Sequence, residues 1–93
     1  MSVHESEAYE QQIELYRSKL DLLDEIIMNA LSSRFEITDQ IGMLKKEFGM
    51  AVFEKKREEE ILKRVDLYEK SAANIFEVYK TIMIQSKIRQ ENI

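Results

Sequence analysis

Hydrophobic residues recur every three or four positions along the first half of the chain. This spacing places their side chains on one face of an amphipathic helix. We therefore predict a single long helix over about residues 6–48, roughly 60 Å long at a rise of 1.5 Å per residue. The repeat is formed by Leu20, Leu23, Ile27, Leu31, Ile41, Leu44 and Phe48.

Two shorter helices are predicted to follow. Gly49 suits the C-cap of the first helix, because glycine readily adopts the left-handed conformation found there. The second helix is predicted over about residues 54–67 and the third over about 71–91, with Ser71 or Asn74 able to cap the third. The inward face of the third helix is predicted to consist of Ile75, Phe76, Val78, Tyr79, Ile82 and Met83.

The length of the first helix points to a partner chain. A chain of 93 residues is expected to form one domain over residues 1–93, and a globule of this size is only about 25–30 Å across. A helix twice as long leaves part of its apolar face uncovered, and small chains often gain apolar burial by association. We therefore predict an all-α fold with three helices per chain, arranged as an intertwined helical homodimer.

Composition and charge exclude several classes of protein. The chain is 44% hydrophobic and 34% charged, with a net charge of −4 and no cysteine. It is too apolar for a disordered chain, and it lacks the basic balance typical of nucleic-acid binders. It has no apolar run long enough to cross a membrane, its acidic start MSVHESEAYE does not resemble a signal peptide, and it cannot form disulfides. We expect a cytoplasmic protein with no nucleic-acid or membrane partner.

Two cations interrupt the apolar face of the long helix. Arg34 and Lys45 are eleven residues apart, which places them within about 20° of one another and roughly 16 Å apart along the axis. Their long side chains could converge on a small dianion between them. Arg17 lies roughly 25 Å further down the axis. It cannot share one small-molecule site with Arg34 of its own chain, but in an antiparallel dimer it could reach the partner's site.

Other polar residues extend the candidate site. Glu54 and Glu58 are four residues apart on the second helix with Arg57 beside them, and Ser86 and Gln90 are four apart on the third. The chain offers neither a cysteine nor a glycine-rich phosphate loop, and its one histidine lies in the predicted N-terminal tail. No metal-ligand cluster is recognisable. An alternative interpretation is that the inward cations form ion pairs with acidic residues such as Glu58 across a helix interface.

Taken together, these positions resemble the all-helical class of chorismate mutase. The resemblance runs from about residue 15 to residue 90. It is carried by LYRSKLDLLDEII, by SSR ending at Arg34, by IGMLKK with Lys45, by KREEEIL with Glu58, and by SKIRQ ending at Gln90. It implies an isomerase of aromatic amino-acid biosynthesis (the shikimate pathway) that converts chorismate to prephenate by an intramolecular Claisen rearrangement. Such chemistry requires no nucleophile, metal or cofactor, only orientation and donors placed where negative charge develops.

The resemblance also implies roles for individual residues. Arg34 would bind one substrate carboxylate, and Arg17 of the other subunit would bind the second with the help of Ser86. Lys45 and Gln90 would donate hydrogen bonds to the ether oxygen. Because Gln90 is a neutral amide, activity should persist at neutral pH.

The remaining implied contacts surround the substrate ring. Glu58 would accept a hydrogen bond from the ring hydroxyl, with Arg57 and the backbone near Glu54 close by, and Ile41 and Met83 would form apolar walls. The chain departs from the family pattern in two places, since the connector after the first helix has no proline and Glu54 stands where aspartate is common.

Two rival functions remain open at this point. Isochorismate pyruvate lyase shares the fold and many of the cations, but Glu58 and Ser86 favour the mutase. A non-catalytic helical dimer that binds an anion or a partner protein is the other rival. It would leave four residues without a common purpose: Arg17, Arg34, Lys45 and Gln90.

Overall fold

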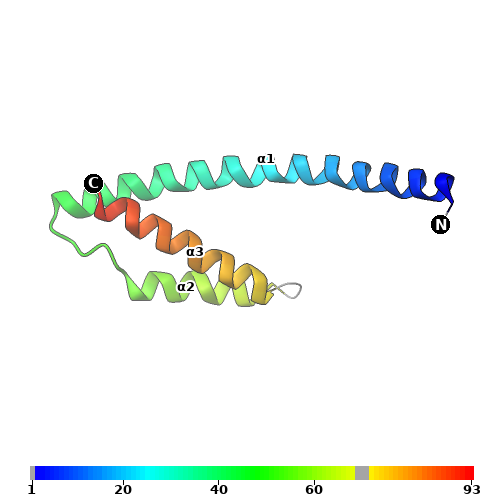
Figure 1. Ribbon diagram of the computed structural model, residues 1–93. Helices are drawn as coiled ribbons and strands as arrows, with labels where there is room; N and C mark the ends of the chain where they lie inside the picture. The colour runs from blue at the N-terminus through cyan, green and yellow to red at the C-terminus, as the bar shows by residue number, and fades with distance from the viewer. Residues whose placement is uncertain (1, 69–71) are drawn as a thin grey trace. The chain divides into compact units, whose positions relative to one another are not determined.

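The computed structural model describes residues 2–68 and 72–93 and contains three helices (Figure 1). They are α1 (Val3–Glu47), α2 (Lys55–Asp66) and α3 (Ala72–Glu91). No strand occurs in the described residues. The predicted all-α fold with one very long first helix is confirmed. The alternative cap of the third helix, Ser71, lies outside the described residues.

Helix α1 begins at Val3, earlier than the predicted Ser6, because its first turn is capped by side chains. The Glu5 backbone N–H donates to Ser2 Oγ at 3.2 Å, and the Ser2 backbone N–H donates to Glu5 Oε2 at 3.2 Å. This reciprocal arrangement is a capping box, which satisfies N–H groups that the helix itself leaves unpaired. His4 therefore lies in an exposed first turn rather than in a tail.

Helix α1 ends as the sequence predicts, at a glycine. Gly49 has a φ of 65°, its N–H donates to the Lys46 carbonyl, and the Met50 N–H donates to the Lys45 carbonyl at 2.7 Å. This pair of bonds is the Schellman motif, which requires a left-handed residue at the position of Gly49. The chain then turns back through residues 48–54 to reach α2.

The chain divides into two compact units. The first extends to Arg34 and the second is Phe35–Ile93. The first unit is the N-terminal part of α1, and its large apolar side chains are exposed, among them Leu20, Leu23 and Ile27, each more than half accessible. The second unit contains the end of α1, the connector and both short helices.

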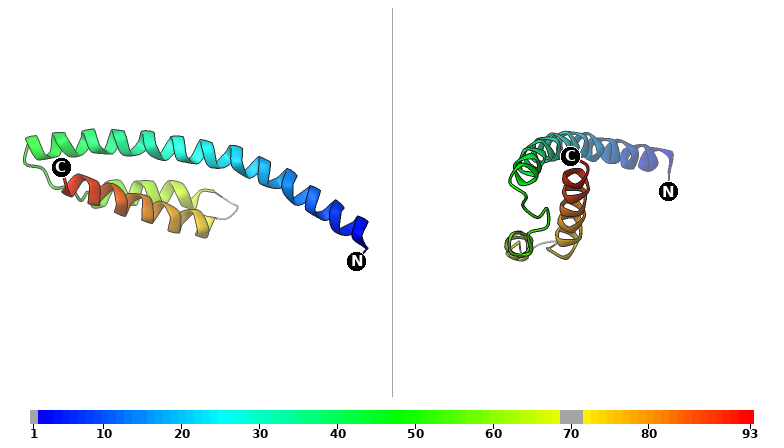
Figure 2. Two further views of the ribbon diagram at one scale, coloured as in Figure 1. Left: turned by 45° about the horizontal axis from the view of Figure 1, so that its top comes forward. Right: turned by 90° about the vertical axis from the view of Figure 1, so that its left-hand side faces the viewer.

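The core of the second unit lies between α2 and α3, which contact each other where the end of α2 meets the start of α3 (Figures 1 and 2). Ile61 and Val65, one turn apart on α2, are buried, and so is Met83 of α3. The predicted inward face of α3 is partly confirmed, because Met83 is buried while Val78 is 57% exposed. Within the described residues, no helix combines the length and apolar character needed to span a membrane.

Candidate active site

Lys45 is a buried cation in the last turn of α1. Only 7% of the residue is exposed. Its Nζ donates a hydrogen bond to the Val52 carbonyl at 2.8 Å and forms an ion pair with Glu54 Oε1 at 2.9 Å. A buried ammonium is stable only with such partners. They are available because the turn at Gly49 brings the connector back against the end of α1.

Glu54 occupies the N-cap position of α2 without capping it through its side chain. Its carboxylate pairs with Lys45 instead, while its backbone carbonyl accepts the Glu58 N–H at 3.1 Å. The alternative read from the sequence, that an inward cation pairs with an acidic residue, is therefore correct for Lys45, but the partner is Glu54 and not Glu58.

Glu58 is half-buried on α2 and faces a cation that sequence reasoning missed. Lys87 Nζ lies 3.6 Å from Glu58 Oε2, and the same ammonium lies 4.7 Å from the centre of the Phe53 ring. Lys87 immediately follows Ser86, so a helical wheel places it on a neighbouring face of α3. Its pairing with Glu58 depends on how α2 and α3 pack, which the sequence does not disclose.

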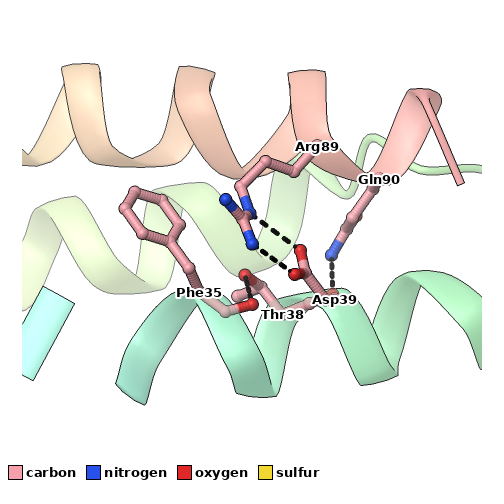
Figure 3. Close-up of polar contacts among 5 residues, drawn as sticks. All are labelled: Phe35, Thr38, Asp39, Arg89 and Gln90. Carbon is pink, nitrogen blue, oxygen red and sulfur yellow. Dashed lines mark hydrogen bonds and ion pairs between the residues drawn. The ribbon is translucent and has the colours of Figure 1, made fainter. Parts of the chain in front are cut away.

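Helix α3 presents Ser86 and Gln90 inward, as their four-residue spacing predicts. Ser86 is 7% exposed and its Oγ donates to the Ile82 carbonyl at 3.0 Å. Gln90 is half-buried, and its Nε2 donates to the Thr38 carbonyl of α1 at 2.7 Å (Figure 3). The amide therefore lies against α1, the helix that carries Lys45.

Beside Gln90, a second contact joins the same two helices. Arg89 Nε donates to Asp39 Oδ1 at 3.0 Å, and a terminal nitrogen of Arg89 donates to Asp39 Oδ2 at 2.5 Å (Figure 3). The hydrogen bonds from Arg89 lower the pKa of the Asp39 carboxyl below its ordinary value, and those to Asp39 raise the pKa of Arg89. Sequence reasoning missed this pair, because residues fifty positions apart carry no local signal of their contact.

Most of the other predicted site residues are exposed. Arg57 is exposed, with its guanidinium 3.7 Å from Glu60 Oε2 on its own helix, and Ile41 is 41% exposed. In the first unit, Arg17 is exposed and pairs with Glu14 at 2.6 Å. Arg34 is half-buried at the end of that unit.

The second unit thus carries three of the predicted hydrogen-bond donors and a predicted carboxylate, each with contacts of its own. Lys45, Ser86 and Gln90 supply an ammonium, a hydroxyl and an amide, and Glu58 supplies the carboxylate. Such a set can bind an oxygen-rich anion and stabilise charge that develops on it. Across residues 2–68 and 72–93, no three His, Cys, Asp or Glu side chains gather closely enough to hold a metal ion.

The fold and the residue pattern together define an all-α protein with one long helix. Hydrogen-bond donors face inward from the last turn of α1 and from α3. The family model for chorismate mutase type II matches residues 16–91 of the chain. The chain therefore belongs to the chorismate mutase type II family, which confirms the resemblance seen in the sequence.

A solved structure gives independent support for the fold. A conserved hypothetical protein from Pyrococcus furiosus is 34% identical, with a TM-score of 0.73, over 85% of this chain and 95% of that chain. Its description names no activity, so it supports the fold and says nothing of substrate. No curated protein matches the chain.

Proposed function

We propose that this protein is a chorismate mutase, an isomerase that rearranges chorismate to prephenate in aromatic amino-acid biosynthesis, with residues 1–93 acting as one domain. The observation that carries the proposal is the buried ammonium of Lys45, in a chain that matches the family model over residues 16–91. A helix that buries a lysine among partners on the connector keeps a positive charge where apolar side chains would otherwise pack.

The rearrangement needs little chemistry from the protein. The ether C–O bond breaks as a new C–C bond forms within one molecule, no proton is transferred, and negative charge grows on the ether oxygen. Lys45 and Gln90 donate to that oxygen in the proposed mechanism. A preorganised donor aimed at developing charge is worth roughly 3–4 kcal/mol, far more than it would contribute to binding in water.

In this proposal, the rest of the rate acceleration comes from orientation of the substrate. Arg34 binds one substrate carboxylate, while Ser86 and the partner subunit's Arg17 bind the other, so that the substrate is held in a compact, chair-like conformer. Glu58 accepts a hydrogen bond from the ring hydroxyl. The Lys87 ammonium lies 3.6 Å from this carboxylate.

The remaining family positions complete the proposed pocket. Arg57 and the backbone near Glu54 lie beside the hydroxyl end of the substrate, and Met83 and Ile41 form its apolar walls. Met83 is already buried, whereas Ile41 is 41% exposed in a single chain. A partner chain packed on α1 would cover Ile41 and place it in a pocket.

We further propose that the functional form is a homodimer. Leu20, Leu23 and Ile27 are 54%, 53% and 53% exposed on one face of α1. A small chain gains apolar burial by covering such a face. A second copy fits best, because its α1 carries the same apolar face and would bring a second Arg17.

The test is an assay of purified protein with chorismate, following the loss of chorismate absorbance and identifying the product. Prephenate is the expected product. Release of pyruvate from isochorismate, with no turnover of chorismate, would assign the protein to the lyase branch of the fold. Absence of turnover with both substrates would leave a non-catalytic helical dimer as the better description.

A further inference from the structure

The last turn of α3 is attached to α1 by two adjacent contacts that involve consecutive residues on both helices (Figure 3). Gln90 Nε2 donates to the Thr38 carbonyl at 2.7 Å, and the next residue of α1, Asp39, accepts two hydrogen bonds from the preceding residue of α3, Arg89. The catalytic amide of the proposed mechanism is thus immediately beside an ion pair.

The geometry of this ion pair restricts motion of α3. Two parallel N–H···O bonds fix the plane of the guanidinium against the carboxylate, which a single contact cannot do. The guanidinium also lies 5.1 Å from the centre of the Phe35 ring, and the Asp39 side chain is only 27% exposed. The lowered pKa of Asp39 and the raised pKa of Arg89 keep both groups charged.

The Gln90 side chain has little freedom to choose another position. It passes over Gly42 so closely that a Cβ added there would lie 2.7 Å from Gln90 Cγ. A glutamine amide has two N–H donors and one oxygen. Because the Thr38 carbonyl can only accept, it selects the nitrogen end of the amide and leaves the second N–H pointing in one defined direction.

We propose that the Asp39–Arg89 ion pair is a positioning device for the Gln90 amide, with Arg89 a positioning residue that does not touch the substrate. This inference rests on the proposed function, in which the second N–H of Gln90 donates to the ether oxygen. The Asp39–Arg89 ion pair holds the last turn of α3 against α1. Gln90 therefore keeps its hydrogen bond to the Thr38 carbonyl, and its second N–H keeps its direction. Misplacement of a catalytic group by about 1 Å can lower a rate a hundredfold.

The kinetic test compares Arg89→Met and Asp39→Asn with Arg64→Met, which removes an exposed arginine from α2. We expect the first two to lower kcat about ten- to hundredfold with KM changed less than about threefold, and the control to leave both near normal. The double variant should be no worse than either single variant, because both act as one unit. Losses that multiply in the double variant would overturn the proposal.

A second double-mutant cycle tests whether Arg89→Met lowers kcat through Gln90. In a Gln90→Ala background, Arg89→Met should produce no further loss of kcat, since no amide remains to be positioned. A further tenfold loss in that background would show that Arg89 acts by another route. Circular dichroism checks that each variant keeps its helices, and Asp39→Asn, which is nearly isosteric, serves if Arg89→Met fails to fold.

A spectroscopic measurement tests the position of the Gln90 amide without an activity assay. In NMR spectra, the Gln90 side-chain NH₂ should show one proton shifted and protected from exchange by the Thr38 carbonyl, unlike the exposed Gln12. In the Arg89→Met variant, the chemical shifts and exchange protection of the Gln90 NH₂ should become more like those of Gln12. Unchanged Gln90 signals in that variant would overturn the positioning role. An unaltered protein that fails to turn over chorismate while the Gln90 signals respond would instead overturn the proposed function.

Discussion

Lys45 and Glu54 form a 2.9 Å ion pair that joins the last turn of α1 to the start of α2. The two partners differ in exposure, since the lysine side chain is 9% accessible and that of the glutamate is 48%. The ammonium also donates to the Val52 carbonyl at 2.8 Å. In the proposed mechanism, the more exposed Glu54 carboxylate is the partner that an anionic substrate would replace at Lys45.

Replacement of Lys45 by alanine should remove catalysis. We expect kcat to fall about a hundred- to a thousandfold, the value of one donor to a developing oxyanion. Lys55→Ala is a matched control, because Lys55 is an exposed lysine near the same segment, 3.8 Å from Glu59 in an i, i+4 pair. The measurement is kcat for chorismate, with sedimentation to check that the oligomer persists. Near-normal kcat in the Lys45 variant would remove this residue from the mechanism.

Glu54→Gln should tighten substrate binding. The substitution removes a negative charge next to Lys45 but keeps the Val52 contact and the backbone of Glu54. A half-exposed ion pair contributes at most about 1 kcal/mol, so we expect KM for the dianionic substrate to fall about two- to fivefold with little change in kcat. Steady-state kinetics at constant ionic strength measures both. A raised KM would mean that the carboxylate assists binding.

Gly42→Ala should separate activity from stability. Alanine favours a helix over glycine by about 1 kcal/mol, but its Cβ would lie 2.7 Å from Gln90 Cγ and 2.9 Å from Ile93 Cδ1. Gln90 must therefore shift, and we expect kcat to fall about tenfold. The midpoint of urea unfolding should stay close to that of the unaltered protein. Rate assays and urea titration provide the two readouts.

Gly49→Ala is the matched control for that variant. A Cβ at Gly49 meets nothing within 4 Å, but the residue has a φ of 65°. This change should lower stability by about 1 kcal/mol and leave the kinetics of the folded protein nearly normal. The same pattern in both glycine variants would argue against a special role for the contact at Gly42.

Mixing two inactive variants should restore activity if the site is shared between subunits. Arg17→Ala and Lys45→Ala chains each lack one part of every site in their own homodimers. In a mixed dimer, one of the two sites receives Arg17 from one chain and Lys45 from the other. Random exchange should therefore recover about a quarter of the normal activity. Co-refolded mixtures that stay inactive, despite mass-spectrometric detection of mixed dimers, would contradict a shared site.

Acid should weaken the attachment of α3 through Asp39. Because the pKa of Asp39 is lowered in the folded chain, its contribution to stability is present above the ordinary carboxyl pKa of about 4 and is lost as the pH falls through the lower, folded value. The free energy of unfolding should decline more steeply from pH 5 downward in the unaltered chain than in Asp39→Asn. Urea titrations at several pH values test this, and parallel declines would contradict it.

The fold was largely accessible from the sequence, because its signals are local. The period of the apolar residues predicted α1, and Gly49 predicted where it ends, since a Schellman motif depends on a few neighbouring residues. The start of α1 lies earlier than the apolar period predicts, because Ser2 and Glu5 carry the spacing of a capping box, a local signal that the apolar period does not contain.

The site was accessible only in part. The position of Lys45 on an apolar stripe predicted its burial, and the spacing of Ser86 and Gln90 predicted that both face inward. The partners of these residues were not predictable, because they depend on packing between helices. Glu54 in place of Glu58 beside Lys45, Lys87 beside Glu58, and the Asp39–Arg89 pair all follow from how the connector returns and how α3 lies against α1.

The hydrogen bond from Lys45 to the Val52 carbonyl has a consequence for regulation of the site. An ammonium has three N–H donors, and the connector at residues 48–54 engages it through the Val52 carbonyl and the Glu54 carboxylate. A ligand that draws on the same cation is thermodynamically linked to the order of that segment, and the linkage is reciprocal. A molecule that binds the connector between α1 and α2 and orders or disorders it should therefore change the affinity of Lys45 for an anionic ligand.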